Sequence, residues 1–331
     1  MKSKPDIIKD VRSFMKSRAI LSAAELDFFS LLDGDFISAE DLADNLGLDK
    51  RATTRLLDCL VTFDLLEKKK DHYLTTEKAS CLSSKNPDSV LPMINHMNTI
   101  WDNWSRLTDI VRTGSNSKLR SVVDSTSKED RSAFIGAMHV AAKRISTKIA
   151  EAYDLSPFKK LLDIGGGSGA YTIAFLKKNP KLNAVIFDLE SVIPITKEKI
   201  AESGLQNRVR FVSGNFYEDT LPDGCDLALL SAIIHQNSPQ QNLALYRKIN
   251  HVLDPGGSLI IRDHIMDESR TNPPAGALFA LNMLVNTPAG DTYTFNEVKD
   301  TMEAAGFAEI KLVISGKEMD CLVEAKKPAF A

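Results

Sequence analysis

One histidine stands where a general base is expected in an α/β protein. His235 follows the apolar stretch 225–230, which has the length and composition of a buried strand. An imidazole with a free pKa near 6.5 is mostly neutral at pH 7, whereas only about a thousandth of an aromatic hydroxyl with a pKa near 10 is ionised. A histidine can therefore act as a general base that removes the proton of such a hydroxyl. General-base catalysis typically raises the rate by about 10²–10⁴-fold. An arbitrary histidine is more often structural, so it is the location that favours a catalytic role.

A glycine-rich turn lies closer to the N-terminus. The apolar stretch 161–164 runs into Gly165, Gly167 and Gly169, and a helical stretch, 170–178, follows. Glycines permit positive φ and close approach of a ligand to bare backbone, and the first N–H groups of a helix offer donors to a carboxylate or phosphate. The spacing also fits the dinucleotide pattern G-x-G-x-x-G/A, so the turn alone does not decide which ligand binds.

Two carboxylates narrow the choice of ligand. Asp163, two residues before the first glycine, suits a cationic group such as an amino group and would repel a pyrophosphate. Asp188 ends the apolar stretch 183–187 and precedes Leu189. An acid at a strand end about 20 residues after the glycines is placed to hold both hydroxyls of a ribose. Together the two acids favour a nucleoside that carries an amino acid.

These residues lie in a region where short apolar stretches alternate with helical ones. The expected strands are 159–164, 183–187, 208–213, 225–230 and 257–262, and two more follow near the C-terminus. Such alternation predicts an α/β fold with a doubly wound parallel sheet, whose ligand site lies at the carboxyl ends of the strands. Each residue named above falls at such an end.

Four stretches in combination resemble the S-adenosylmethionine-dependent O-methyltransferases typified by plant phenolic and hydroxyindole enzymes. They are Asp163 with its glycines, Asp188, Gly214-Asn215-Phe216-Tyr217 and Pro255-Gly256-Gly257. The resemblance covers nearly the whole chain and implies a Rossmann-like class I methyltransferase domain that binds S-adenosyl-L-methionine. It implies a set of cofactor contacts at Asp163, Gly165, Gly167, Asp188, Leu189, Asn215, Phe216 and Ser231.

The resemblance also implies roles in proton transfer. The family's catalytic histidine aligns with His235, and an acid of the family aligns with Asp263. A neutral catalytic imidazole usually needs a partner on its other nitrogen, so we assign Asp263 the orienting role. The family's second acid aligns with Thr292, which leaves the second orienting contact open. We place Thr292 in the acceptor pocket.

The chain departs from the family pattern around the cofactor. Gln236 and Asn237 replace the aspartate and tryptophan that follow the catalytic histidine, and Ser231 replaces a lysine near the cofactor. Asn215 replaces the aspartate that accepts the adenine amino group, but a side-chain amide oxygen can accept the same bond. We therefore expect cofactor binding to survive and the acceptor chemistry to be specific to a subgroup.

The acceptor pocket is expected to use the helical stretch 129–153. Its methionine and aromatic residues repeat at three- or four-residue spacing, a pattern that more often marks a helix packed in the core. In the family this helix walls the pocket, and Phe134 and Met138 match its F-x-x-x-M motif. Met283 matches a further clamping methionine, and its neighbour Asn282 is a polar candidate.

The N-terminal region reads as helix, turn, helix and β-wing. Its helices are expected at 39–46 and 50–63 and its short strands at 65–68 and 72–75. A winged helix can bind DNA, with the basic residues of the second helix as readers. The resemblance instead implies an intertwined homodimer. We expect a winged-helix dimerisation domain at 1–85, linking helices at 86–155, the first over 87–113, and a methyltransferase domain at 156–331.

Composition fits a soluble enzyme. The 331 residues carry a net charge of −3, which gives no general attraction to nucleic acid or to an anionic membrane. The four cysteines are scattered, and no signal peptide or apolar run of about 18 residues is visible, so we expect a cytoplasmic protein with reduced thiols. An alternative hypothesis is a Mg²⁺ site at Asp263, Asp267 and Glu268. Because His235 stands where such a site needs an acid, we expect no metal.

The expected function is O-methylation of a small aromatic or heteroaromatic hydroxyl by S-adenosyl-L-methionine. Family members recruited to decarboxylation, hydroxylation or pericyclic chemistry offer an alternative, because the surroundings of His235 are altered. A ligand-sensing regulator built on the winged helix is a third, non-enzymatic reading. The sequence does not identify the acceptor or exclude nitrogen and sulfur acceptors.

Overall fold

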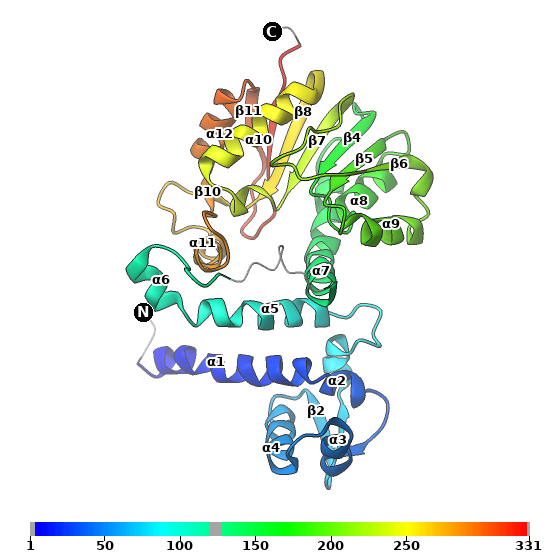
Figure 1. The fold of residues 1–331 in the computed structure, drawn as a ribbon, viewed down its shortest axis with the longest axis vertical. Helices are drawn as coiled ribbons and strands as arrows, with labels where there is room; N and C mark the ends of the chain where they lie inside the picture. Colours follow the sequence, from blue (N-terminus) through cyan, green and yellow to red (C-terminus); the bar gives the residue numbers. More distant parts are fainter. Residues whose placement is uncertain (1–3, 120–127, 330–331) are drawn as a thin grey trace. The chain divides into compact units, whose positions relative to one another are not determined.

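The computed structural model describes residues 4–119 and 128–329, which form two compact units (Figure 1). The division falls after Trp101, inside helix α5 (Leu91–Trp104). Each unit has its own hydrophobic core. No helix in the described part of the chain is long and apolar enough to cross a membrane.

The N-terminal unit combines helices with a small antiparallel sheet. Its helices are α1 (Lys4–Glu25), α2 (Phe28–Leu31), α3 (Ala39–Leu46) and α4 (Lys50–Val61), followed by the 3₁₀ helix η1 (Glu77–Leu82). Its strands β1 (Ile37–Ser38), β2 (Leu66–Lys69) and β3 (His72–Thr75) pair in the order β1-β3-β2. The Ser38 hydroxyl and the Asp49 carboxylate accept backbone N–H groups at 3.0 and 2.7 Å and so start α3 and α4. The elements follow the expected order of helix, helix and hairpin.

The C-terminal unit is built on one seven-stranded sheet. The strands are β4 (Lys160–Ile164), β5 (Asn183–Asp188), β6 (Val209–Ser213), β7 (Cys225–Ser231), β8 (Leu253–Asp263), β11 (Ala308–Ile314) and β12 (Cys321–Lys326). Their order is β11-β12-β8-β7-β4-β5-β6. The pairs among β4 to β8 are parallel, as expected, while β12 and β11 are antiparallel to their neighbours. The doubly wound α/β fold is confirmed.

Helices cover both faces of this sheet (Figure 1). They are α7 (Lys128–Ala152), α8 (Ala170–Lys178), α9 (Ile193–Glu202), α10 (Pro239–Val252) and α12 (Phe295–Ala304). Two more helices, α6 (Leu107–Thr113) and α11 (Pro274–Asn286), contact each other. Shorter elements are the 3₁₀ helices η2 (Gln206–Arg208) and η3 (Ile234–Gln236) and the strands β9 (Ile265–Met266) and β10 (Tyr293–Thr294). The expected single helix over 87–113 was wrong, because Arg106 has non-helical dihedral angles and separates α5 from α6.

Side chains alternate strictly between the two faces of the sheet. Leu161, Leu229 and Ile260 pack with α7 and α8, while their neighbours Leu162 and Leu230 pack with α10 and α12. This alternation follows from the period of two in a strand. Because β4 lies between β5 and β7, the chain reverses its winding there, and α/β folds commonly bind ligands at the carboxyl end of the strands at such a point.

The central strands should dominate stability. Replacing Leu229, which is fully buried on β7, by Ala should lower the free energy of unfolding by about 2–5 kcal/mol, because it leaves a cavity. The matched control is Leu312→Ala on edge strand β11, where the side chain is 37% exposed. Urea titration followed by circular dichroism measures both. Equal losses for the two variants would contradict this account of the core.

Candidate active site

The carboxyl ends of four parallel strands bring the predicted residues to one edge of the sheet. In spatial order the strands are β8, β7, β4 and β5. They end near Asp263, Ser231, Gly165 and Asp188. The cross-strand register places Ser231 opposite Arg262, and backbone pairing of β4 with β5 continues up to the glycine turn. Residues separated by up to a hundred positions in sequence thus share a single site.

The glycine turn has the backbone shape that its sequence predicts. Gly165, Gly167 and Gly169 have φ values of 68°, 55° and 75°, in the region that disfavours other residues. A Cβ atom on Gly165 would lie 2.7 Å from the side chain of Ile233, so packing also demands glycine there. A Cβ atom on Gly167 would have no described atom within 4 Å. The turn therefore leaves free space in front of its second glycine, where a ligand can approach the backbone.

The carboxylate of Asp188 is fixed against this turn. One of its oxygens accepts the N–H of Gly167 at 2.7 Å, and the other accepts the N–H of Leu189 at 2.7 Å. A carboxylate can accept about four hydrogen bonds, so each oxygen keeps a lone pair for a ligand hydroxyl. Burial raises the pKa of Asp188. Its geometry fits two adjacent ribose hydroxyls.

A second buried carboxylate lies beside the first. Asp163 is 2% exposed and accepts the Thr172 hydroxyl at 2.6 Å. Burial, together with the nearby charge of Asp188, raises the pKa of Asp163 to about 6. No ion pair within the described residues joins a cation to either carboxylate, and two neighbouring carboxylates of this kind favour a positively charged ligand. The residues at this end of the sheet thus fit the amino-acid-bearing nucleoside that their types predict.

The turn after β6 supplies the residues expected near an adenine. The side-chain oxygen of Asn215 accepts the N–H of Tyr217 at 3.0 Å and retains a lone pair for another donor. The ring of Phe216 is tilted against that of Tyr217, with centroids 4.5 Å apart. Phe216 also borders the glycine turn, since a Cβ atom on Gly165 would lie 3.6 Å from it. Phe216 therefore lies beside the glycine turn, and Asn215 directly precedes it in the chain.

His235 and Asp263 form a buried pair. Nδ1 of His235 lies 2.9 Å from each carboxylate oxygen of Asp263, which is fully buried. Burial alone would raise the pKa of Asp263, but the His235 ring, the Arg262 charge and the N–H of His264 together hold it below its usual value. An ionised Asp263 fixes the proton of the imidazole on Nδ1. Nε2 is then left as a proton acceptor.

The surroundings of His235 limit its movement. The ring of Phe279 meets it edge-on at 4.9 Å, and the backbone carbonyl of His235 accepts the N–H of Asp291 at 2.9 Å. A Cβ atom on Gly290 would lie 2.4 Å from that carbonyl oxygen, so glycine is required in this loop. Thr292 follows, is buried, and donates its backbone N–H to Asp291. The loop thus packs on the backbone of the histidine.

The residues expected to hold the acceptor lie on two helices. Phe134 and Met138 are half-buried on α7, four residues apart and so on one face, and Met283 is buried on α11. The amide oxygen of Asn282 accepts the indole N–H of Trp104 at 2.9 Å and an N–H of Asn286 at 3.0 Å. The structure therefore gives Asn282 an internal bonding role that the sequence did not indicate.

Two further residues at the site, Phe279 and His139, were missed by sequence reasoning, whereas His264 stands one residue past the end of β8, where the sequence allows it to face the pocket. Phe279 lies one helical turn before Met283 on α11, a spacing that would have identified it. His264 is buried, with its ring 5.0 Å from that of Phe279. His139 on α7 directly follows Met138, and its Nδ1 lies 2.9 Å from the Ser168 hydroxyl of the glycine turn. Nothing in the pattern around His139 predicts that contact.

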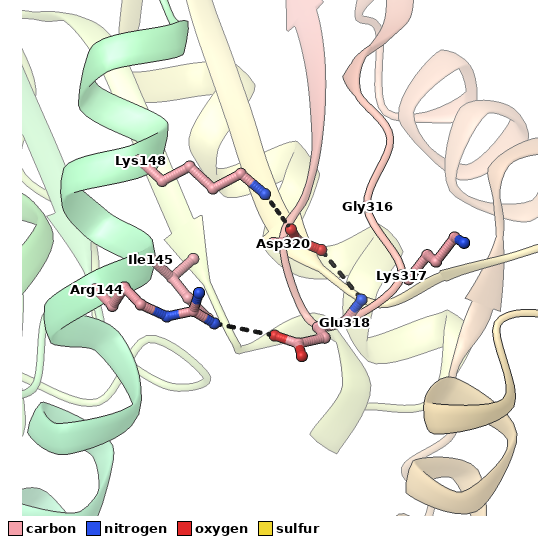
Figure 2. A pocket seen from close by; sticks show the side chains of 7 residues that line it. All are labelled: Arg144, Ile145, Lys148, Gly316, Lys317, Glu318 and Asp320. Atoms are coloured by element: carbon pink, nitrogen blue, oxygen red, sulfur yellow. Dashed lines mark hydrogen bonds and ion pairs between the residues drawn. The ribbon is translucent and has the colours of Figure 1, made fainter.

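A cavity of about 330 Å³ lies away from these residues (Figure 2). It is lined by α7 and the loop between β11 and β12. Two ion pairs span the cavity, Lys148 with Asp320 at 2.6 Å and Arg144 with Glu318 at 3.4 Å. Lys317 also lines it, so most of the charge in the cavity is neutralised by pairing within the protein. No group of three or more His, Cys, Asp or Glu within 4–119 and 128–329 is arranged to hold a metal ion.

The chain matches two family models. The model described as the O-methyltransferase domain matches residues 104–308, and the model described as the O-methyltransferase dimerisation domain matches residues 9–85. The first match lies within the C-terminal unit and the second within the N-terminal unit.

Similar curated proteins span nearly the whole chain. The tetracenomycin polyketide synthesis 8-O-methyl transferase of Streptomyces glaucescens is 30% identical over 330 residues, which are 98% of this chain and 96% of that protein. The acetylserotonin O-methyltransferase of Gallus gallus is 30% identical over 330 residues, 95% of this chain and 94% of that protein.

Solved structures extend the similarity to the fold. Human N-acetylserotonin methyltransferase in complex with SAM is 25% identical and has a TM-score of 0.84, with 99% of each chain covered. The mitomycin 7-O-methyltransferase is also 25% identical, with a TM-score of 0.86 over 98% of this chain and 97% of that chain.

The raised pKa of Asp163 predicts how the stability of the protein without ligand depends on pH. The folded state holds this proton more tightly than the unfolded state, whose aspartate pKa is about 3.9, so stability falls as the pH rises from about 4 to 6. Asp163→Asn removes this loss and should raise the free energy of unfolding by about 1–3 kcal/mol at pH 7 but little at pH 4. Denaturant titrations at several pH values test it.

The matched control is Asp300→Asn on the exposed surface of α12. It should show no such pH-dependent gain. A constant difference between Asp163→Asn and the unmutated protein from pH 4 to 7 would contradict the assignment of a buried, titrating carboxylate.

Proposed function

Because this chain belongs to the S-adenosylmethionine-dependent O-methyltransferase family, we propose that it methylates a hydroxyl of a small aromatic or heteroaromatic acceptor with His235 as the general base. The observation that carries the proposal is the buried His235–Asp263 pair at the strand ends next to the glycine turn. This pair joins a proton acceptor to the edge of the sheet that carries the cofactor residues.

The cofactor is proposed to lie along the ends of β4, β5 and β6. Asp163 would face its ammonium group, Asp188 its ribose hydroxyls, and Asn215 and Phe216 its adenine. The free space before Gly167, the remaining lone pairs of Asp188 and the unbalanced charge of Asp163 support this placement. When bound, S-adenosylmethionine supplies a methyl group that is already electrophilic, so the protein must mainly orient the acceptor and exclude water.

The proposed proton transfer uses Nε2 of His235. Asp263 keeps the proton of the neutral ring on Nδ1, so Nε2 can accept the hydroxyl proton of the acceptor. The ring then becomes an imidazolium beside an ionised carboxylate, and the pair is electrically balanced. Because the Asp263 side chain is 1% exposed and the His235 side chain 11%, this charge attraction acts with little screening by water.

The acceptor is proposed to be a flat, hydroxylated ring. The name of the similar Gallus gallus protein gives acetylserotonin as the molecule on which that enzyme acts. In this chain Phe134, Met138 and Met283 offer apolar and polarisable surfaces for such a ring. We propose that Thr292 lines the pocket on the side of the loop that packs on His235, and that Asn282 contributes through its hydrogen-bonded position on α11.

A homodimer is the proposed assembly. The matched dimerisation model covers residues 9–85, and helix α1 in that region exposes an apolar stripe. Its side chains are 52–68% exposed, and they are Ile7, Ile8, Val11, Phe14 and Met15. Contiguous apolar surface of this kind marks an interaction site. A second copy of the chain is the partner that the match to a dimerisation domain supports.

His235→Ala tests the general base. Turnover of a hydroxylated aromatic acceptor should fall at least about 100-fold, while cofactor affinity by calorimetry should stay nearly unchanged, because a lost base affects the chemical step. The control is His251→Ala, whose side chain is exposed on α10. Acceptors come from a panel of phenols, hydroxyindoles and hydroxybenzimidazoles, and mass spectrometry should show a gain of one methylene. Unchanged turnover in His235→Ala would reject the base, and a product without the added methylene would favour non-methylating chemistry.

Asp263→Asn tests the orienting role. The amide has nearly the same shape but no charge, so it neither fixes the ring tautomer nor stabilises the imidazolium. Turnover should fall by about 100-fold or more with little change in the acceptor's KM. Steady-state kinetics of the folded variant measures this. A variant with normal kcat would show that His235 does not depend on this carboxylate.

A further inference from the structure

Arg262 is a buried cation at the carboxyl end of β8. Arg262 is only 5% exposed. Its Nε donates to the Ser231 hydroxyl at 3.0 Å, and its Nη1 donates to the backbone carbonyl of Met319 at 2.9 Å. Among the described residues, its guanidinium forms no ion pair within 4.0 Å, and the neighbouring Asp263, on which its charge acts, is already paired with His235. A charge removed from water in this way is costly unless an anion joins it. The two bonds also leave guanidinium donors available.

A second unsatisfied donor lies next to it. The guanidinium carbon of Arg262 is 5.1 Å from the ring centroid of Tyr171. The Tyr171 hydroxyl is near Ser231, but it has no partner of hydrogen-bond geometry in the described chain and no contact with solvent. Tyr171 stands in the first turn of α8, directly after the glycine turn. An anion placed here would meet a charged donor and a hydroxyl donor together.

The position of Arg262 continues a row of charged groups. The strands β8, β7, β4 and β5 are neighbours in that order and end with Arg262, Ser231, Asp163 and Asp188. Each of these four residues is two or four positions along its strand from an apolar residue that packs with α7 and α8, so all four lie on that face of the sheet. The apolar residues are Ile260, Leu229, Leu161 and Ala184. Along this one face the charge runs from positive to negative. The α-carboxylate, ammonium and ribose of S-adenosylmethionine follow one another in the same order.

We infer that Arg262 binds the α-carboxylate of S-adenosylmethionine, with the Tyr171 hydroxyl as a second donor. Ser231, at the place where the family has a lysine, lies directly opposite Arg262 in the strand register. In this chain the positive charge is therefore on β8, whereas the family has it on the strand that corresponds to β7. Ser231 holds the guanidinium of Arg262 in position. The inference rests on the cofactor part of the proposed function and is independent of the acceptor and of His235.

A purely structural role is the alternative, since Arg262 also bonds the loop between β11 and β12 through Met319. That loop has other attachments, however. Lys148 and Arg144 of α7 reach Asp320 and Glu318 across the cavity in Figure 2. A structural role would not distinguish ligands with a carboxylate from ligands without one. This difference provides the test.

The experiment measures calorimetric affinity for two ligands, S-adenosylhomocysteine and its analogue that lacks the α-carboxylate. The full-length unmutated protein should prefer the first. Arg262→Gln should weaken its binding by about 10- to 100-fold, the value of a lost charge-assisted hydrogen bond, and change binding of the analogue by no more than about twofold. Arg262→Lys, which keeps the charge, should restore part of the preference.

The matched control is Arg208→Gln. Arg208 also donates to several backbone carbonyls, those of Leu176, Asn179 and Leu182, but belongs to the opposite end of the sheet. It should lower thermal stability without altering the preference between the ligands. Equal weakening of both ligands in Arg262→Gln would overturn the inference. If no acceptor is methylated but the preference is lost in Arg262→Gln, the carboxylate site stands and only the proposed reaction fails.

Discussion

The balance of buried charge at the carboxyl edge of the sheet is the constraint on which the site depends. Asp263 is compensated within the protein, because His235 lies against both of its oxygens. Asp163 and Asp188 have hydrogen bonds but no cationic partner in the part of the chain that the structure describes, and burial raises the pKa of each. The free protein therefore holds its proton-transfer pair ready and keeps its ligand site electrostatically incomplete. Stability given up there becomes binding energy when a cationic ligand arrives.

The alternation of side chains in β8 lets one strand end serve two tasks. Adjacent residues of a strand point to opposite faces, so Arg262 faces the layer of α7 and α8 while Asp263 faces the layer of α10 and α12. A displacement of one residue in the pairing of β8 with β7 would exchange these positions. The six-residue ladder between β8 and β12 fixes the register from the other side.

Much of this arrangement could be predicted from the sequence, and the limits have physical reasons. The parallel sheet and the glycine turn follow from strand alternation and from residue types at strand ends, whereas the pairing of His235 with Asp263 was predicted from the family resemblance. Phe279 and His139 were missed because their importance arises from packing between helices that local patterns do not encode. The helix over 87–113 was predicted as continuous because the residues at 105 and 106 are compatible with a helix, and only the tertiary fold separates α5 from α6. The role of Arg262 depends on cross-strand register, which a single sequence leaves undetermined.

The amide bonds around Asn282 have a consequence for how such a pocket can diversify. Asn282 and Asn286 on α11 bond to Trp104 and Asn103, and Asn116 reaches the carbonyl of Val285 on the same helix. Hydrogen bonds are directional, so this set fixes the rotation of α11 about its own axis. Apolar residues on that helix can then be exchanged one at a time during evolution while the backbone that carries them keeps its orientation. Helix α11 thus keeps one orientation while the apolar side chains that it carries can vary.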